Sequence, residues 1–315
     1  MSESLATAPS YKKIFDPAPT TEVAGIRRPL IYCWKHDVVL TLNVALATRR
    51  ALLLKGEPGI GKSTIAEAAA TALNWRFYRH VVTSRTEAQD LTWRFDYVRR
   101  LADAQSSQRT GRDGTDLDHS EYLIPGPFWW AFNPTAASRK GQVTDNAPEI
   151  PDPFAANAQR HPQGAVVLID EIDKADPAVA NDLLETLGAG RFRVDGIHKP
   201  FDVEWSPVAG GGQSERAIDG GLLVVFTSND ERDLPEAFMR RCVVKEMRWA
   251  QSSDMERAEF DQFLGEVARE NWLRMTDAEP VDPNRNVSMK MRHRGVEFSV
   301  AREALGSRLS LRPAG

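Results

Sequence analysis

A glycine-rich stretch, Gly56-Glu-Pro-Gly-Ile-Gly-Lys-Ser63, restricts the fold of this chain more than any other feature of the sequence. It follows the short apolar run 51–55 and precedes an alanine-rich segment, residues 63–73, whose apolar residues recur at helical spacing. The pattern G-x-x-x-x-G-K-S between a buried strand and a helix is typical of a phosphate-binding loop. The alternative, a glycine-rich turn that binds nothing, does not account for the flanking strand, the helix and the Lys-Ser pair.

Each residue type in this loop suits phosphate chemistry. The glycines allow the backbone to bend so that N–H groups point at a phosphate, and the helix N-terminus adds its positive dipole end. Lys62 supplies a point charge for the β- and γ-phosphates of a nucleotide, and the hydroxyl group of Ser63 can bind Mg²⁺. The predicted nucleotide-binding residues are Gly56, Glu57, Pro58, Gly59, Ile60, Gly61, Lys62, Ser63 and Thr64.

Four carboxylates follow a second apolar run, residues 165–169. Asp170 ends the predicted strand, where open α/β sheets bind ligands, so we expect it to hold Mg²⁺ together with Ser63. Glu171 is placed to polarise the attacking water as a general base. Asp176 precedes a proline and suits the N-cap of a helix, whereas Asp173 is interpreted as structural or solvated.

Two further sets of polar residues are candidates for catalysis. Asn229 follows the apolar run 222–226 and is predicted to position the water or to contact the γ-phosphate, although such a Ser-Asn-Asp cluster is usually a turn. Arg240 and Arg241 end a short predicted helix. They form either a surface basic pair or an arginine finger, which offsets charge on the γ-phosphate in the transition state. The predicted catalytic residues are therefore Glu171, Asn229, Arg241 and Arg240.

Apolar runs alternate with helical segments along the chain, a pattern typical of parallel α/β sheets. The expected fold class is a three-layer αβα fold with a parallel five-stranded core sheet. The predicted strands are residues 51–55, 76–82, 165–169, 222–226 and 243–247.

The pattern divides the chain into three parts. Residues 1–35 are rich in Pro, Ala and Thr and are predicted to form an irregular arm. Residues 36–249 are predicted to form the nucleotide-binding domain, with an insert at about 90–160. Residues 250–315 are predicted to form a small helical lid, with a helix at 254–274, and a basic tail.

The insert holds the densest aromatic cluster of the chain, within residues 122–132. Its sequence Pro-Phe-Trp-Trp-Ala-Phe has two interpretations. The preferred one is buried core that packs the insert against the main domain. The other is a contact surface for a substrate or a neighbouring subunit.

Composition limits the class of protein. The net charge of −4 gives no general reason to expect nucleic acid as the main partner. The two cysteines, Cys33 and Cys242, imply no disulfide framework and fit a reducing compartment. No apolar run approaches the roughly 20 residues of a membrane span, and the N-terminus does not resemble a signal peptide. We therefore expect a cytoplasmic protein.

These motifs, in this order, resemble the AAA+ ATPases, and more narrowly their MoxR-like branch, over residues 38–249. GEPGIGKST resembles the Walker A loop of the family, VVLIDEID its Walker B strand, FTSND its sensor 1 strand and LPEAFMRRC the segment that carries its arginine finger. TSRTEAQD and PGPFWW resemble the insert region of MoxR-type proteins. RFRVDGIH resembles the start of the hairpin that precedes sensor 1 in the family.

The resemblance implies more than the motifs do. It implies ATP and Mg²⁺ as cofactors, a homo-oligomeric ring of six subunits, and a nucleotide at each subunit boundary. Arg241 matches the finger position best and Arg240 second, each acting on the neighbouring subunit. The family is linked to the remodelling of partner proteins, often ones with a von Willebrand factor A domain. The chain departs from the family in the lid, where no arginine of residues 251–315 is distinguished as sensor 2, and residues 277–295 are predicted to be loop or linker.

Two other functions remain open at this level. One is a nucleotide-gated scaffold or switch in a defence or stress complex, which would use the same residues and hydrolyse ATP slowly. The other is the motor subunit of a DNA-acting complex, which the basic C-terminal stretch permits. No recognisable DNA-binding module supports that second alternative.

Overall fold

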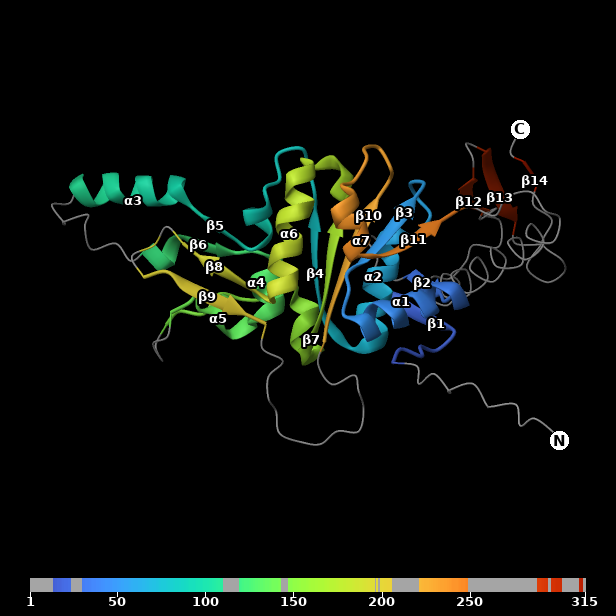
Figure 1. Ribbon diagram of the computed structural model, residues 1–315, viewed down its shortest axis with the longest axis horizontal. Helices are drawn as coiled ribbons and strands as arrows, with labels where there is room; N and C mark the ends of the chain where they lie inside the picture. Colours follow the sequence, from blue (N-terminus) through green and yellow to red (C-terminus); the bar gives the residue numbers. More distant parts are fainter. Residues whose placement is uncertain are drawn as a thin grey trace, which may run out of the picture. The chain divides into compact units, whose positions relative to one another are not determined.

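The computed structural model describes residues 14–23, 30–109, 119–142, 147–195, 197, 199–205, 221–248, 288–293, 296–301 and 312–313 of the chain. It divides into two compact units (Figure 1). The first comprises Met1–Ala18 and Trp34–Met247, and the second comprises Pro19–Cys33 and Arg248–Gly315. Each unit is described by itself.

A parallel five-stranded sheet forms the centre of the first unit, with the strand order β11-β3-β10-β7-β4 (Figure 1). Every neighbouring pair is parallel. The predicted α/β class and the five-stranded parallel sheet are therefore confirmed. The strands are β3 (Leu52–Gly56), β4 (Trp75–Val81), β7 (His161–Asp170), β10 (Leu222–Ser228) and β11 (Val243–Met247).

Helices cover both faces of this sheet and make it the middle of three layers (Figure 1). The helices of the first unit are α1 (His36–Thr48), α2 (Lys62–Leu73), α3 (Tyr97–Arg109), α4 (Pro127–Phe132), α5 (Pro134–Ser138), α6 (Pro177–Ala189) and α7 (Glu236–Arg241). Short 3₁₀ turns are η1 (Ala88–Leu91), η3 (His119–Tyr122), η4 (Ala155–Gln159) and η5 (Ile172–Lys174).

The sheet separates two apolar layers because successive side chains of a strand point to opposite faces. Leu53, Val167 and Phe226 pack in one cluster with buried side chains of α4, α6 and α7. Leu52 and Val166 are buried too but lie outside that cluster, on the face that α1 and α2 cover. Because both faces are apolar there, the inner strands β3, β7 and β10 contain continuous hydrophobic runs in the sequence.

The segment between β4 and β7 contains a two-stranded sheet of its own. Strands β5 (Trp93–Phe95) and β6 (Leu123–Pro125) pair antiparallel, and α3 lies between them in the chain. Figure 1 shows α3 extending away from the central sheet. The antiparallel pair β8 (Arg191–Val194) and β9 (Phe201–Glu204) then precedes β10, in the place where the resemblance implied a hairpin.

The aromatic run of α4 belongs to the core, as preferred from the sequence. Phe128, Trp129 and Phe132 are each no more than 1% exposed. The Phe132 ring packs 5.8 Å from that of Phe192 and 6.0 Å from that of Trp205, measured between centroids. The run therefore attaches the inserted segment and the β8–β9 hairpin to the central sheet and offers no contact surface.

Replacing Phe132 with alanine is expected to lower the free energy of unfolding by about 3–5 kcal/mol, because the change leaves a cavity in a packed aromatic core. Replacing Tyr97, which is 73% exposed on α3, with alanine is the matched control and should change it by less than about 0.5 kcal/mol. Urea denaturation of both variants measures the difference. Equal midpoints for the two variants would show that α4 is not core.

The second unit contains strands that the sequence patterns did not predict. β1 (Thr20–Val23) pairs antiparallel with β2 (Leu30–Cys33), in a segment predicted to be irregular. β12 (Ser288–His293) and β13 (Val296–Ala301) form a three-stranded antiparallel sheet with β14 (Arg312–Pro313), where loop or linker was predicted up to residue 295. The predicted lid helix at 254–274 lies outside the described residues.

Among the helices that the structure describes, none combines the length and the apolar character needed to cross a membrane.

Candidate functional site

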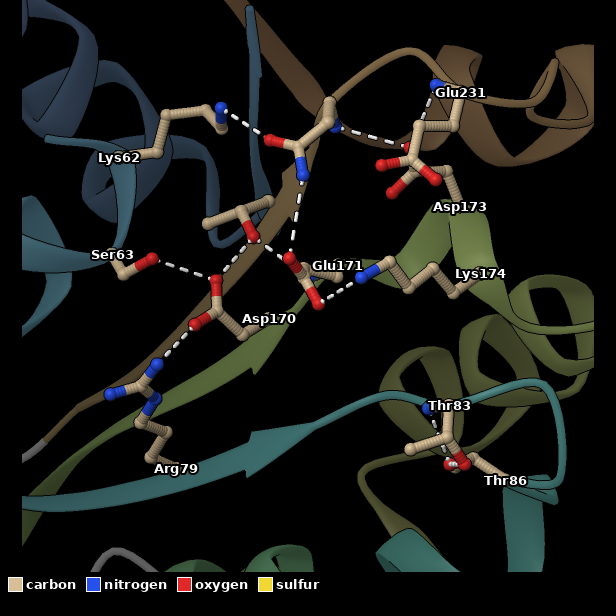
Figure 2. A network of polar contacts seen from close by, with 12 residues as sticks. Lys62, Ser63, Arg79, Thr83, Thr86, Asp170, Glu171, Asp173, Lys174 and Glu231 are labelled. Atoms are coloured by element: carbon tan, nitrogen blue, oxygen red, sulfur yellow. Dashed lines mark hydrogen bonds and ion pairs between the residues drawn. The ribbon is translucent and has the colours of Figure 1, made fainter. Parts of the chain in front are cut away.

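Three of the central strands bring the predicted site residues together at one edge of the sheet. In the strand register Ser228 pairs with Lys55, and Phe226 pairs with Ile169. The loop after β3, Asp170 at the end of β7 and Asn229 after β10 therefore meet at the carboxyl ends of parallel strands, where open α/β sheets bind ligands. Figure 2 shows the polar side chains of this edge converging on one another.

The glycine-rich loop has the backbone that a phosphate cradle requires. Gly56 approaches β11 so closely that an added Cβ would collide with the carbonyl group of Met247. Gly59 and Gly61 have φ angles of +81° and +93°, which L side chains rarely adopt. An added Cβ at either would meet nothing within 4 Å, so the outer side of the loop is open. The helix α2 begins directly after it, at Lys62.

Lys62 is only 6% exposed, and its ammonium group spans the loop. It donates hydrogen bonds to the carbonyl oxygens of Gly56 at 2.7 Å and Glu57 at 2.9 Å, and to Oδ1 of Asn229 at 2.8 Å. Burial lowers the pKa of Lys62, and the nearby Asp170 carboxylate opposes that shift. A bound phosphate would add negative charge and favour the protonated lysine further.

Asp170 is buried, with its side chain 7% exposed, and both carboxylate oxygens have partners. Its Oδ1 accepts hydrogen bonds from Ser63 Oγ at 2.7 Å and from Thr227 Oγ1 at 2.6 Å. Its Oδ2 forms an ion pair with Arg79 of β4 at 2.5 Å. The two residues predicted to bind a metal, Ser63 and Asp170, thus lie within hydrogen-bonding distance of each other (Figure 2).

Glu171 adopts a left-handed backbone with φ of 63°, which is unusual for a residue other than glycine. Its backbone N–H donates to Thr227 Oγ1 at 2.9 Å. Its Oε2 pairs with Lys174 at 2.7 Å, and its Oε1 accepts a hydrogen bond of 3.4 Å from Asn229 Nδ2. The hydrogen bond that Lys174 donates to Glu171 raises the pKa of Lys174. Backbone strain of this kind concentrates at functional sites, where surrounding contacts enforce it.

The other two carboxylates of the acidic segment have structural roles. Asp173 is 1% exposed, and its Oδ2 accepts the backbone N–H groups of Asn229 at 3.1 Å and Glu231 at 3.0 Å. It therefore fixes the loop that presents Asn229 and is not a solvated side chain. Asp176 accepts the backbone N–H of Ala178 at 2.8 Å and caps α6, as predicted.

The arginine pair, Arg240 and Arg241, stands apart from this cluster. Both residues are exposed at the end of α7, and Arg240 forms an ion pair with Glu236 one turn earlier, at 2.7 Å. In the described part of the chain, neither side chain forms a hydrogen bond or ion pair with Asp170 or Glu171. The cluster is therefore assembled without them.

Three residues of the site are absent from the sequence-based prediction, namely Arg79, Thr227 and Lys174. Arg79 reaches Asp170 only because β4 pairs with β7, and no local pattern indicates that pairing. Thr227 lies two residues before Asn229, inside an apolar strand, where a threonine is an ordinary strand residue. Lys174 was visible as a cation three residues after Glu171, within the turn that follows β7.

A family model for the AAA domain of the dynein-related subfamily matches residues 51–242, more than half of the chain. The chain belongs to this AAA family. The matched region of this AAA protein begins just before β3 and ends just after α7, so it includes every site residue described above.

Among solved structures, this AAA protein is similar to a crystal structure of a candidate ATPase from Cytophaga hutchinsonii, with 16% identity and a TM-score of 0.36. The match covers 72% of this chain and 49% of that protein, so the chain spans about half the length of its relative. Curated proteins give no significant match.

The residues of this AAA domain fit a magnesium nucleotide. Among the described residues, no group of three or more His, Cys, Asp or Glu side chains is arranged to hold a metal ion by itself. Mg²⁺ in nucleotide sites instead takes one or two protein oxygens and completes its shell with phosphates and water. Ser63 Oγ and Asp170 Oδ1, 2.7 Å apart next to the open side of the loop, supply such a pair.

Thr227 offers a test of this arrangement. Replacing it with valine keeps the shape but removes the hydroxyl that orients Asp170 and accepts the Glu171 N–H. We expect the Mg²⁺ concentration for half-maximal ATP turnover to rise about 10–100-fold, as is typical when a residue behind a metal ligand is lost. Thr227→Ser is the matched control and should stay close to wild type. An unchanged Mg²⁺ requirement in the valine variant would show that Thr227 does not orient Asp170 for metal binding.

Proposed function

We propose that this chain is a Mg²⁺-dependent ATPase of the MoxR type, which uses ATP hydrolysis to remodel or activate a partner protein. The main support for this proposal is the arrangement of five polar side chains at one edge of the sheet. Lys62, Asn229 and Glu171 form a continuous hydrogen-bonded chain, and Ser63 and Asp170 lie beside it at the same sheet edge. Phosphate binding, metal binding and water activation need these residue types within one site.

Each residue would have a distinct part in hydrolysis. The loop N–H groups and Lys62 would hold the β- and γ-phosphates, replacing the carbonyl contacts that Lys62 now makes. Mg²⁺ held by Ser63 and Asp170 would neutralise charge on the phosphates. Asn229 would orient the attacking water, and Glu171 would accept its proton as the water attacks the γ-phosphorus. The bond from that phosphorus to the β–γ bridging oxygen would break, and ADP would leave with the bonding electron pair.

The catalytic cation would come from a second subunit. The arginine pair is exposed and, in the described part of the chain, forms no hydrogen bond or ion pair with Asp170 or Glu171, whereas a finger must reach the γ-phosphate. We therefore propose a homo-oligomeric ring, a hexamer by its resemblance to the MoxR branch, in which Arg241 completes the site of the neighbour. Each ring interface is then heterologous and closes by rotation.

The type of partner follows from the same resemblance, and a protein with a von Willebrand factor A domain is proposed. The cytoplasm is the proposed location because the two cysteines, Cys33 and Cys242, imply no disulfide framework and fit a reducing compartment. Adenine is proposed as the base from the resemblance alone, because nothing in the phosphate loop would read the base. The predicted domain limits, 36–249 for the ATPase domain and 250–315 for the lid, are retained as part of the proposal.

A nucleotide-gated switch with slow turnover is the second candidate function. It is favoured by the two ion pairs that occupy the carboxylates, Arg79 with Asp170 and Lys174 with Glu171. Lys174 occupies one oxygen of the proposed base, and hydrolysis would wait until a partner opened the pair. The two candidates share every site residue and differ in their turnover rate.

The test is ATP turnover by the purified protein with Mg²⁺, with EDTA, and in the Lys62→Ala variant. The proposal expects phosphate release that EDTA abolishes and that Lys62→Ala reduces to background, since both changes remove charge from the phosphates. Tight ATP binding without release would favour the switch. Absence of ATP binding in the wild type would refute both candidates.

A further inference from the structure

Arg50 contacts the end of the helix that carries the arginine pair, although it lies far from that helix in the sequence. It follows the C-terminus of α1 and precedes β3. Its Nε donates a hydrogen bond to the carbonyl oxygen of Arg241 at 3.1 Å. Its Nη2 donates to the carbonyl oxygen of Cys242 at 2.9 Å and also to that of Arg240. One guanidinium group thus binds three consecutive carbonyls.

These carbonyls need such a partner. The last carbonyl groups of any helix lack hydrogen bonds within the helix, and a cation at the C-terminus interacts favourably with the helix dipole. The helix α7 has six residues, so its end forms a large part of it. Its other anchor is Phe238, which is fully buried and packs with Phe226 at 5.0 Å between ring centroids.

The two anchors hold different parts of α7. Phe238 packs the middle of the helix against the sheet. Arg50 binds the C-terminal end, at the backbone carbonyls of Arg240 and Arg241. The next backbone link, from Val243 N–H to the Ala51 carbonyl at 2.8 Å, ties the same two segments together as β11 begins.

We infer that Arg50 is a positioning residue for the arginine finger, which sets the direction in which Arg241 leaves the subunit. The inference rests on the proposed function, in which that arginine acts on a neighbour. Arg50 touches no nucleotide and acts only through α7. Exposed polar contacts contribute little to stability, whereas a misplacement of about 1 Å in a catalytic group can lower the rate about 10²-fold. The main effect of losing Arg50 is therefore expected in catalysis.

The test uses two kinds of subunit, a donor that supplies Arg241 to its neighbour and an acceptor whose site is completed by that arginine. Acceptor subunits carry Arg241→Ala, so they hydrolyse ATP only when a neighbour supplies the finger. Donor subunits carry Glu171→Gln, so they supply a finger but do not turn over. Phosphate release from mixed rings then measures how well the donor positions its arginine. Donors with Glu171→Gln and Arg241→Ala together give the background.

Three donors are compared on the Glu171→Gln background. Arg50→Met removes all three hydrogen bonds and is expected to lower the activation about 10–100-fold. Arg50→Lys keeps the charge but not the fork, and should give an intermediate value. Arg49→Met is the matched control, because in the described part of the chain the neighbouring Arg49 side chain makes no hydrogen bond or ion pair, and it should activate like the unmodified donor.

A second readout distinguishes positioning from general stability. In rings made only of Arg50→Met subunits, kcat for ATP should fall by the same factor, while KM and the urea denaturation midpoint stay near wild type. A merely structural arginine would move the midpoint and leave kcat unchanged. If Arg50→Met subunits fail to enter mixed rings by size-exclusion chromatography, the Arg50→Lys donor decides, and its full activation would overturn the inference.

The outcomes also separate this inference from the proposed function. If Glu171→Gln donors fail to activate Arg241→Ala acceptors, the finger is not shared and the proposed function is wrong in that respect. If they do activate and the Arg50→Met donors activate equally well, the shared finger stands and the role of Arg50 is refuted.

Discussion

Replacing Glu171 with glutamine is expected to lower kcat for ATP about 10²–10⁴-fold while ATP still binds. The amide has nearly the same shape and can still contact Asn229, whose Nδ2 lies 3.4 Å from Oε1. It cannot accept a proton from water, so only the chemical step is lost. Phosphate release at saturating ATP and equilibrium binding of a fluorescent ATP analogue measure the two effects separately.

A matched control comes from α6, where Glu185 is exposed and distant from the cluster. Glu185→Gln makes the same chemical change and should leave kcat within about twofold of wild type. Turnover within tenfold of wild type in Glu171→Gln would show that another group takes the proton. Loss of ATP binding would instead show that Glu171 supports the structure of the site.

Replacing Arg241 with alanine is expected to have a comparable or larger effect, about 10³-fold or more in kcat, as arginine fingers do. The reason is electrostatic, since the guanidinium group offsets charge that develops on the γ-phosphate only in the transition state. KM for ATP should change little, because the ground-state phosphates are held by Lys62 and the loop. Steady-state kinetics at a fixed, high protein concentration gives both constants.

Arg240→Ala is the control next to it. Arg240 already pairs with Glu236 on the same helix, at 2.7 Å, and both side chains are more than three-quarters exposed. We expect its replacement to lower kcat less than tenfold, because such an exposed pair contributes little. The reverse order of effects would identify Arg240 as the finger and require a rotation of α7 relative to its present position.

The three inner strands of the central sheet were predictable because they are buried on both faces. The runs 51–55, 165–169 and 222–226 each contain several consecutive apolar residues, and all became strands of one sheet. The run 243–247 has only Val243 and Val244 in sequence, and it forms the partly exposed edge strand β11. The observed β7 nevertheless begins earlier, at His161, since backbone pairing with β4 continues past the apolar run. Hydrophobicity locates the buried centre of a strand and says little about its ends.

The candidate site was predictable where a residue lies in a local motif. Lys62, Ser63, Asp170 and Glu171 fall within two short patterns, and the structure places them in one cluster. Arg79 was not predictable, because its contact with Asp170 depends on the pairing of β4 with β7. Contacts across strands arise from register, which a single sequence does not display.

The hairpin of the second unit could have been recognised. Met289, Met291, Phe298 and Val300 alternate with polar residues along β12 and β13, which is the period-two pattern of an antiparallel strand. The surrounding polar and proline residues favoured a loop interpretation instead. Alternation over as few as five residues is a weak signal next to such composition, so the pattern was outweighed.

The most direct test of the central claim is the specific ATPase activity of the wild-type protein measured across a range of protein concentrations. If the site of each subunit is completed by Arg241 of a neighbour, activity per subunit must rise with concentration and level off as rings form. A specific activity that stays constant down to concentrations at which the protein is a single chain would contradict the shared site.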